Sequence, residues 1–169
     1  MPLSFLACIL YLSLWVAFRE EKGRESAPVA KRWGRCGWTC VSVDTVRPDG
    51  SRTPMYGPHP HGLVIFDGHG HYALVNSRSD LPKYVSNDRM KGSAEEYRAV
   101  VQGSIAHFGT YVVNEADKTI TFHIDASTFP NWNGVEQRRP FVLSGDELRW
   151  TTPAASGGGS GEVVLRRAK

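Results

Sequence analysis

Four of the six histidines lie within residues 56–72, as two His-x-His pairs, His59/His61 and His69/His71. Imidazoles at such close spacing can bind a metal ion or transfer protons. The surrounding residues are typical of a β-hairpin that turns at Gly68 and His69, which sets His61 and His71 roughly 17 Å apart along the strands. Because zinc needs its ligands at about 2 Å, the sequence predicts no metal site here.

The expected hairpin determines which side chains share a face. A turn at Gly68 places four pairs of residues opposite one another: Phe66 and His71, Ile65 and Tyr72, Leu63 and Leu74, and His61 and Asn76. His61 then shares an apolar face with Leu63, Ile65, Tyr72 and Leu74. We therefore expect His61 at one mouth of an apolar cavity, with a rim histidine of no special role as the alternative.

A second expected hairpin, residues 109–125, turns at residues 115–118. If Asn114 pairs with Thr119, one face carries Tyr111, Val113, Ile120, Phe122 and Ile124, and the other carries threonines and His123. The apolar face is expected to point into the core, which directs His123 outward. A register slip of one residue would reverse this assignment.

Short strand-like runs separated by turn residues continue from Trp38 to the end of the chain, eight in all, and a third hairpin turns at Gly145 and Asp146. Only residues 93–108 have a helical period, opening with Ser93 and Glu96 at the spacing of a capping box. We therefore predict a mainly β fold, an eight-stranded antiparallel barrel with one amphipathic α-helix at about residues 93–108. A barrel of this size leaves room for one small ligand, and the alternative is an interior filled by its own side chains.

The chain has 169 residues, enough for one domain with a sizeable core, and its net charge is only +3. So small a charge does not indicate nucleic-acid binding, which requires a concentrated basic face. Three cysteines form an odd and sparse set that implies no disulfide framework, and a cytoplasmic location is therefore favoured.

The first part of the chain differs from the rest. Residues 3–18 are apolar apart from two serines, and residues 19–35 are charged and aperiodic. As a helix, the apolar segment would be about 24 Å long, shorter than the roughly 30 Å hydrocarbon core of a membrane. It is interpreted either as an anchor or signal or as an extension foreign to the fold, and membrane contact is expected only if residues 3–18 insert. We therefore set residues 1–36 apart from a domain at residues 37–169.

Four stretches of the chain form a recognisable set: PDGSRTPMYGPHPHGLVIFDGHGHYAL, EEYRAVVQGSIAHFGTYVV, STFPNWNGVEQRRPFVLSGDEL and GEVVLRRAK. Together they resemble the lipocalin-like domain family of bacteria and fungi over residues 37–169. The resemblance implies a lipocalin-type barrel whose interior holds a small, mostly apolar molecule, and it transfers no catalytic residues. It also implies that Trp38 packs under an arginine of the last strand, Arg166 or Arg167.

Aromatic side chains dominate the positions expected to line the barrel interior. Tyr72, Tyr111, Phe122 and Trp150 are assigned to inward faces, and loops at a barrel mouth add Tyr56, Phe129 and Trp132. With His61, the expected ligand-binding set is Tyr56, His61, Tyr72, Tyr111, Phe122, Phe129, Trp132 and Trp150. An inward-facing Arg138 or Arg139 could pair with a ligand carboxylate, but we expect both arginines to be exposed.

The leading interpretation is a protein that binds a small hydrophobic or aromatic molecule, and no cofactor is predicted. The alternative is an isomerase- or cyclase-type enzyme of small-molecule (natural-product) metabolism, in which the cavity shapes a reactive intermediate. Its proton-transfer candidates would be Tyr111, His61 and, in a different register, His123. A third alternative is a membrane-tethered scaffold that uses residues 3–18, and no oligomeric state is predicted.

Overall fold

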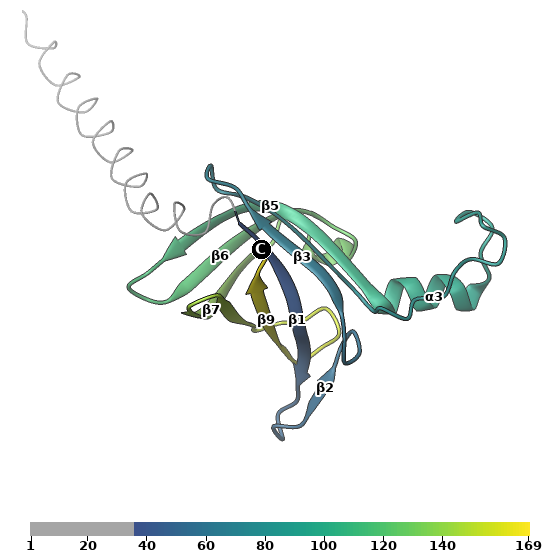
Figure 1. Ribbon diagram of the computed structural model, residues 1–169, viewed down its shortest axis with the longest axis horizontal. Helices are drawn as coiled ribbons and strands as arrows, with labels where there is room; N and C mark the ends of the chain where they lie inside the picture. The colour runs from purple at the N-terminus through teal and green to yellow at the C-terminus, as the bar shows by residue number, and fades with distance from the viewer. Residues whose placement is uncertain (1–35) are drawn as a thin grey trace, which may run out of the picture.

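The computed structural model describes residues 36–169, which form a strongly curved antiparallel sheet with one α-helix beside it (Figure 1). The strands are β1 (Cys36–Val46), β2 (Arg52–Pro54), β3 (His61–Phe66), β4 (His71–Ser77), β5 (Ser104–Asn114), β6 (Thr119–Ser127), β7 (Glu136–Ser144), β8 (Glu147–Thr152) and β9 (Ser160–Arg167). The helices are α3 (Ala94–Gly103) and the single 3-10 turn η1 (Pro130–Trp132). The expectations for residues 1–35 lie outside the described residues. Within residues 36–169, no helix has the length and apolar character needed to cross a membrane.

The sheet closes on itself to form a barrel. From β3 onward each strand pairs with the next, and β9 returns to pair with β1 in antiparallel register from Trp38/Arg167 to Val46/Ser160. The closed ring therefore contains β1 and β3–β9, whereas β2 adds only three residues beside the end of β1. The predicted mainly β, eight-stranded antiparallel barrel is confirmed, with β2 as a short addition.

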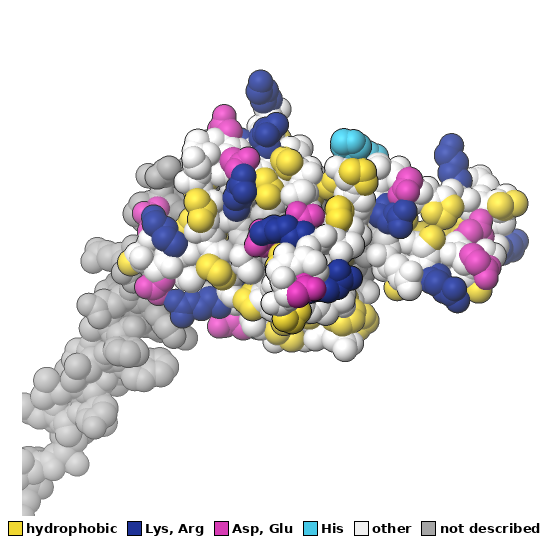
Figure 2. Space-filling model, turned by 90° about the horizontal axis from the view of Figure 1, so that it is seen from below, with side chains coloured by type: hydrophobic (Ala, Val, Ile, Leu, Met, Phe, Trp, Pro, Cys, Tyr) yellow, Lys and Arg dark blue, Asp and Glu magenta, His cyan; other side chains and the backbone are white. Residues whose placement is uncertain are grey.

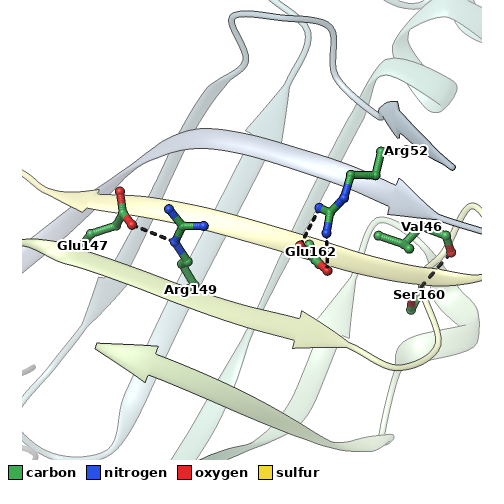
Figure 3. Close-up of polar contacts among 6 residues, drawn as sticks. All are labelled: Val46, Arg52, Glu147, Arg149, Ser160 and Glu162. Atoms are coloured by element: carbon green, nitrogen blue, oxygen red, sulfur yellow. Dashed lines mark hydrogen bonds and ion pairs between the residues drawn. The ribbon is translucent and has the colours of Figure 1, made fainter. Parts of the chain in front are cut away.

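Polar contacts on the outer surface accompany this closure. Arg52 of β2 donates two hydrogen bonds to Glu162 of β9, at 2.5 and 2.9 Å, across the intervening β1 (Figure 3). Arg149 and Glu147 of β8 form a similar exposed pair at 2.7 Å. Exposed ion pairs contribute about 0–1 kcal/mol each. The barrel is therefore held mainly by its backbone hydrogen bonds and by the side chains that point inward.

The inward side chains follow the period of two expected for strands. Register pairs Tyr111 with Phe122 and Asn114 with Thr119, as predicted. Tyr111 and Phe122 are buried, and His123 lies on the exposed face. The second hairpin and the outward direction of His123 are thus confirmed.

The register of the β3–β4 hairpin differs from the prediction by one residue. Phe66 pairs with Tyr72 and His61 with Ser77, because residues 67–71 lie between the paired positions, one residue more than the expected 67–70. Asp67 accounts for the longer turn, since its Oδ1 accepts hydrogen bonds from the amides of His69 and His71 at 2.8 and 2.7 Å. A one-residue shift exchanges faces. His61, Leu63 and Ile65 consequently point outward, so the expected inward position of His61 is wrong.

The predicted helix is shorter than expected. The capping box is present, with Ser93 Oγ accepting from the Glu96 amide and Glu96 Oε2 accepting from the Ser93 amide. The helix ends at Gly103, however, and residues 104–108 belong to β5, where Ile105 and His107 are buried in alternation with their neighbours. Pairing with β4 overrides the helical pattern at these positions.

The helix belongs to an arm, residues 78–103, that stands away from the barrel between β4 and β5 (Figure 1). Val85 is hydrogen-bonded to Glu96, and the Tyr84 and Tyr97 rings lie 5.9 Å apart, so the arm is held by its own contacts. Basic, acidic and apolar side chains are interspersed on its surface (Figure 2). Tyr97 and Val101 of the predicted apolar stripe are 37% and 75% exposed, so this face of the helix does not pack into the barrel core.

The two ends of the barrel differ. One end is formed by the short hairpin turns at residues 67–70, 115–118 and 145–146, and the other by the longer connections 47–60, 78–103, 128–135 and 153–159. At the first end, the Arg167 guanidinium lies 4.5 Å from the ring centre of fully buried Trp38. This confirms the contact implied by the resemblance and assigns it to Arg167, because Arg166 points outward.

Candidate functional site

A cavity enters the barrel at the end with the longer connections. The centre of a water-sized molecule can occupy about 40 Å³ of it. The walls come from six strands of the barrel, from the loops 47–60 and 153–159 and from the 3-10 turn η1. They are Val43, Met55, Tyr56, Leu74, Asn76, Ile105, His107, Trp132, Arg139, Thr152, Ala155, Ser156, Gly161 and Val163. Ligand sites in proteins share this composition, a mostly apolar surface with a few polar groups.

Arg139 of β7 is the charged residue in this wall. Only 2% of it is exposed, and its Nε and Nη2 both donate to Gln137 Oε1, at 3.2 and 2.6 Å. Its guanidinium lies over three aromatic rings, 4.5 Å from Phe122, 5.7 Å from Trp150 and 6.0 Å from Trp132. Burial lowers the pKa of Arg139 to about 10, so the group keeps its positive charge at neutral pH.

A hydrogen-bonded pair of side chains, Tyr72 and His107, lies near Arg139. Tyr72 Oη and His107 Nδ1 are 2.9 Å apart, and both residues are buried. Burial, together with the positive charge of Arg139, lowers the pKa of His107 to about 3, which makes the imidazole neutral at physiological pH. Burial also raises the pKa of Tyr72. The pair therefore supplies neutral hydrogen-bonding groups rather than charge.

Two further polar residues of the wall are Tyr56 and Asn76. Tyr56 follows β2 and is only 4% exposed, because the chain turns inward after the Met55 amide donates to the Val43 carbonyl at 2.8 Å. Burial raises the pKa of Tyr56 to about 12, so its hydroxyl is protonated. Asn76 is buried, and its Oδ1 has no hydrogen-bond partner among the described residues. Tyr56 and Asn76 therefore offer polar groups without charge.

The eight residues of the expected ligand-binding set occupy different places. Tyr56 and Trp132 line the cavity. Tyr72 lies behind the wall, hydrogen-bonded to His107. Phe122 and Trp150 lie against Arg139. Phe129 packs edge-on against Trp132, with the ring centres 5.6 Å apart. Tyr111 lies toward the opposite end, where its hydroxyl donates to the Asp67 carbonyl, and His61 lies on the outer surface.

Sequence reasoning missed His107 and Asn76, and it placed Arg139 wrongly. His107 was assigned to the helix, although alternation of Ile105 and His107 with less buried neighbours continues the β5 pattern. Asn76 shares the predicted inward face of Tyr72 and Leu74, but the expected ligand-binding set does not include it. Arg139 was expected to be exposed, but it shares the inward face of β7 with Phe141, while Arg138 points outward to Asp117 at 2.6 Å. The alternation with Phe141 is the signal that could have identified the inward arginine.

The histidine pairs remain apart from the cavity. His59, His61, His69 and His71 are exposed, and His71 Nδ1 lies 2.9 Å from Asp67 Oδ2. Within residues 36–169, no three His, Cys, Asp or Glu side chains are grouped so that they could hold a metal ion. In this part of the chain the imidazole beside the cavity is that of His107.

Comparison with known proteins agrees with this architecture. A family model described as a lipocalin-like domain matches residues 36–168, almost the whole described chain. No curated protein matches the sequence. The closed antiparallel barrel, the contact of Trp38 with Arg167 and the match over 36–168 together show that the chain belongs to the lipocalin-like domain family.

Proposed function

We propose that this protein binds a small hydrophobic or aromatic molecule inside its barrel. Lipocalin-type barrels of eight strands commonly hold one small ligand, so ligand binding in general follows from the family. The finer statement rests on the cavity. Its walls combine aliphatic side chains such as Leu74, Ile105 and Val163 with the aromatic rings of Tyr56 and Trp132.

Binding of a neutral fluorescent probe tests the proposal. N-phenyl-1-naphthylamine has an aromatic, uncharged surface and fluoresces strongly in apolar surroundings. We expect the protein to enhance its fluorescence with a saturable dependence on concentration. A library of lipophilic molecules can then be screened by displacement of the probe.

Two neighbouring alanines provide a matched pair of variants. Ala155 lines the cavity at its open end, whereas Ala154 is exposed and does not line it. Ala155→Trp should obstruct the mouth and weaken probe binding about tenfold or more, and Ala154→Trp should leave it unchanged. Equal binding by both variants and the original protein would place the probe elsewhere and contradict the proposal.

The hydrogen-bonded pair of Tyr72 and His107 favours an isomerase- or cyclase-type enzyme as the second candidate, since such a pair could orient a reactive intermediate. The earlier candidates Tyr111, His61 and His123 do not line the cavity. Mass spectrometry of displaced ligands after long incubation separates the two functions. A rearranged product whose formation drops about 10² in Tyr72→Phe or His107→Gln supports catalysis, and unchanged ligands support binding alone.

A further inference from the structure

We propose that the molecule taken up by the barrel is an organic carboxylate, with its carboxylate group on Arg139 and its apolar part against the rest of the cavity wall. This inference rests on the proposed binding function and specifies the chemical class of the ligand.

The first step is the absence of a counter-charge. Arg139 is a positively charged group with 2% exposure, and among the described residues no carboxylate lies within ion-pair distance of it. Burying a lone charge is strongly unfavourable unless an opposite charge accompanies it. The neighbouring Arg138, by contrast, is exposed and pairs with Asp117. The β7 strand therefore holds one satisfied arginine outside the barrel and one uncompensated arginine inside.

The second step is the hydrogen-bonding capacity of the guanidinium. Nε and Nη2 of Arg139 share one acceptor, Gln137 Oε1, and Nη1 has no hydrogen-bond partner among the described residues. An arginine offers five N–H donors in a planar fork that suits the two oxygens of a carboxylate. Gln137 and the ring of Phe122 hold this plane in place, so a ligand would meet donors that are already oriented.

The third step is the selectivity of the surroundings. The polar side chains that share the wall with Arg139 are uncharged, namely Tyr56, Asn76, His107, Thr152 and Ser156. The site therefore attracts an anion and repels a cation, and the low polarity around it strengthens both effects. The remaining wall is aliphatic and aromatic, which fits an apolar tail or ring attached to the acid group.

Three molecules that differ only in their head group test this inference: decanoate, decan-1-ol and decylamine. Their affinities can be measured by isothermal titration calorimetry at pH 7.5. We expect decanoate to bind at least tenfold more tightly than decan-1-ol, and decylamine to bind most weakly. The comparison needs no variant, so it is decisive even if a substitution at Arg139 prevents folding.

Two arginine variants then locate the effect. Arg139→Met should reduce decanoate affinity at least tenfold while decan-1-ol affinity changes less than twofold, and Arg138→Met should change neither. Arg139→Lys, which keeps the charge but not the planar fork, should give an intermediate decanoate affinity.

The outcomes separate this inference from the proposed function. Equal affinities of decanoate and decan-1-ol, or a decanoate preference that persists in Arg139→Met, overturn the carboxylate assignment while ligand binding stands. If N-phenyl-1-naphthylamine binds but decanoate does not, the assignment is likewise overturned. If neither the neutral probe nor any of the three molecules binds, the proposed function itself fails.

Discussion

His107 is a neutral imidazole enclosed by the barrel, and this makes the stability of the fold depend on pH. Its pKa is lowered from 6.5 to about 3 by burial and by Arg139. As the pH falls below 6.5, the unfolded chain binds a proton at this residue and the folded chain does not. The contribution of neutral His107 is therefore complete above pH 6.5 and is lost progressively down to about pH 3.

We expect the free energy of unfolding to fall by roughly 3–5 kcal/mol between pH 6.5 and 3 because of this residue alone. Urea denaturation at several pH values measures it. His107→Gln should flatten the pH dependence, although it lowers stability at pH 7 by about 1–2 kcal/mol through the altered contact with Tyr72. His123→Gln, on the exposed face, should leave the dependence as it is. An unaltered slope in His107→Gln would show that other groups cause the acid sensitivity.

The buried charge of Arg139 lowers the stability of the ligand-free protein, and binding of an anionic ligand would offset this loss. Its buried charge is stabilised by Gln137 and by the aromatic rings beneath it, but not by an acidic side chain within residues 36–169. Replacement of a buried charge by an apolar side chain of similar length is often neutral or stabilising. Arg139→Met is therefore expected to raise the free energy of unfolding of the ligand-free protein by about 1–2 kcal/mol.

Chemical denaturation of the two arginine variants checks this expectation. Arg138→Met removes only an exposed ion pair and should change stability by less than about 0.5 kcal/mol. A loss of stability of about 2 kcal/mol or more in Arg139→Met would mean that the guanidinium is fully stabilised where it lies.

At the level of elements, the predicted register is correct for the β5–β6 hairpin and wrong by one residue for the β3–β4 hairpin. The turns of the two hairpins explain the difference. In β5–β6 the pairing of Asn114 with Thr119 follows from the turn, in which Asn114 bonds to Asp117 and Lys118 adopts a left-handed conformation. In β3–β4 the carboxylate of Asp67 folds the chain into a longer turn. The alternation of apolar and polar residues does not show that Asp67 lengthens the turn. The sequence therefore predicts the wrong inward face for β3.

A tight approach between β5 and β6 gives a prediction for that hairpin. The register shifts between Phe108 and Gly109, and a β-carbon at Gly109 would lie 2.0 Å from the His123 carbonyl oxygen. Gly109→Ala must displace backbone rather than a mobile side chain, so we expect a loss of about 3 kcal/mol or more in the free energy of unfolding. Gly68→Ala, where a β-carbon meets nothing within 4 Å, should cost less than about 1 kcal/mol. The midpoints of thermal unfolding of the two variants are then compared. Similar midpoints would contradict the close approach of Gly109 to the His123 carbonyl.

At the scale of the whole molecule, the barrel was predictable because eight alternating segments and their turns leave few ways to bury all the apolar faces. The contents of its interior were less predictable. Side chains such as Arg139 and His107 face inward through strand register, which depends on turn geometry and on neighbouring strands. Residue type favours exposure for arginine. The polar part of the cavity wall therefore became visible only once the strands were paired.

Closure of the barrel joins the strands that are farthest apart in the sequence, as in the hydrogen bond from Thr39 Oγ1 to the Arg166 carbonyl. Arg167 contributes to this junction by stacking on fully buried Trp38 and by pairing with Asp146 at 3.0 Å. Cation–π stacking and the packing of the arginine stem each add stability. Arg167→Ala should therefore lower the free energy of unfolding by about 1–2 kcal/mol, measured by urea denaturation with a single cooperative transition.

Two further variants identify the source of that loss. Arg166→Ala removes an exposed arginine of the same strand, and Asp146→Ala removes only the ion pair, so each should change stability by less than about 0.5 kcal/mol. If Asp146→Ala reproduced the full effect of Arg167→Ala, the ion pair rather than the tryptophan contact would stabilise the junction. If Arg166→Ala caused the same loss in the free energy of unfolding as Arg167→Ala, the positive charge of β9, rather than the position of Arg167 on Trp38, would stabilise the junction. If only Arg167→Ala lowers the free energy of unfolding substantially, the contact between Arg167 and Trp38 stabilises the pairing of β1 with β9 at this end of the barrel.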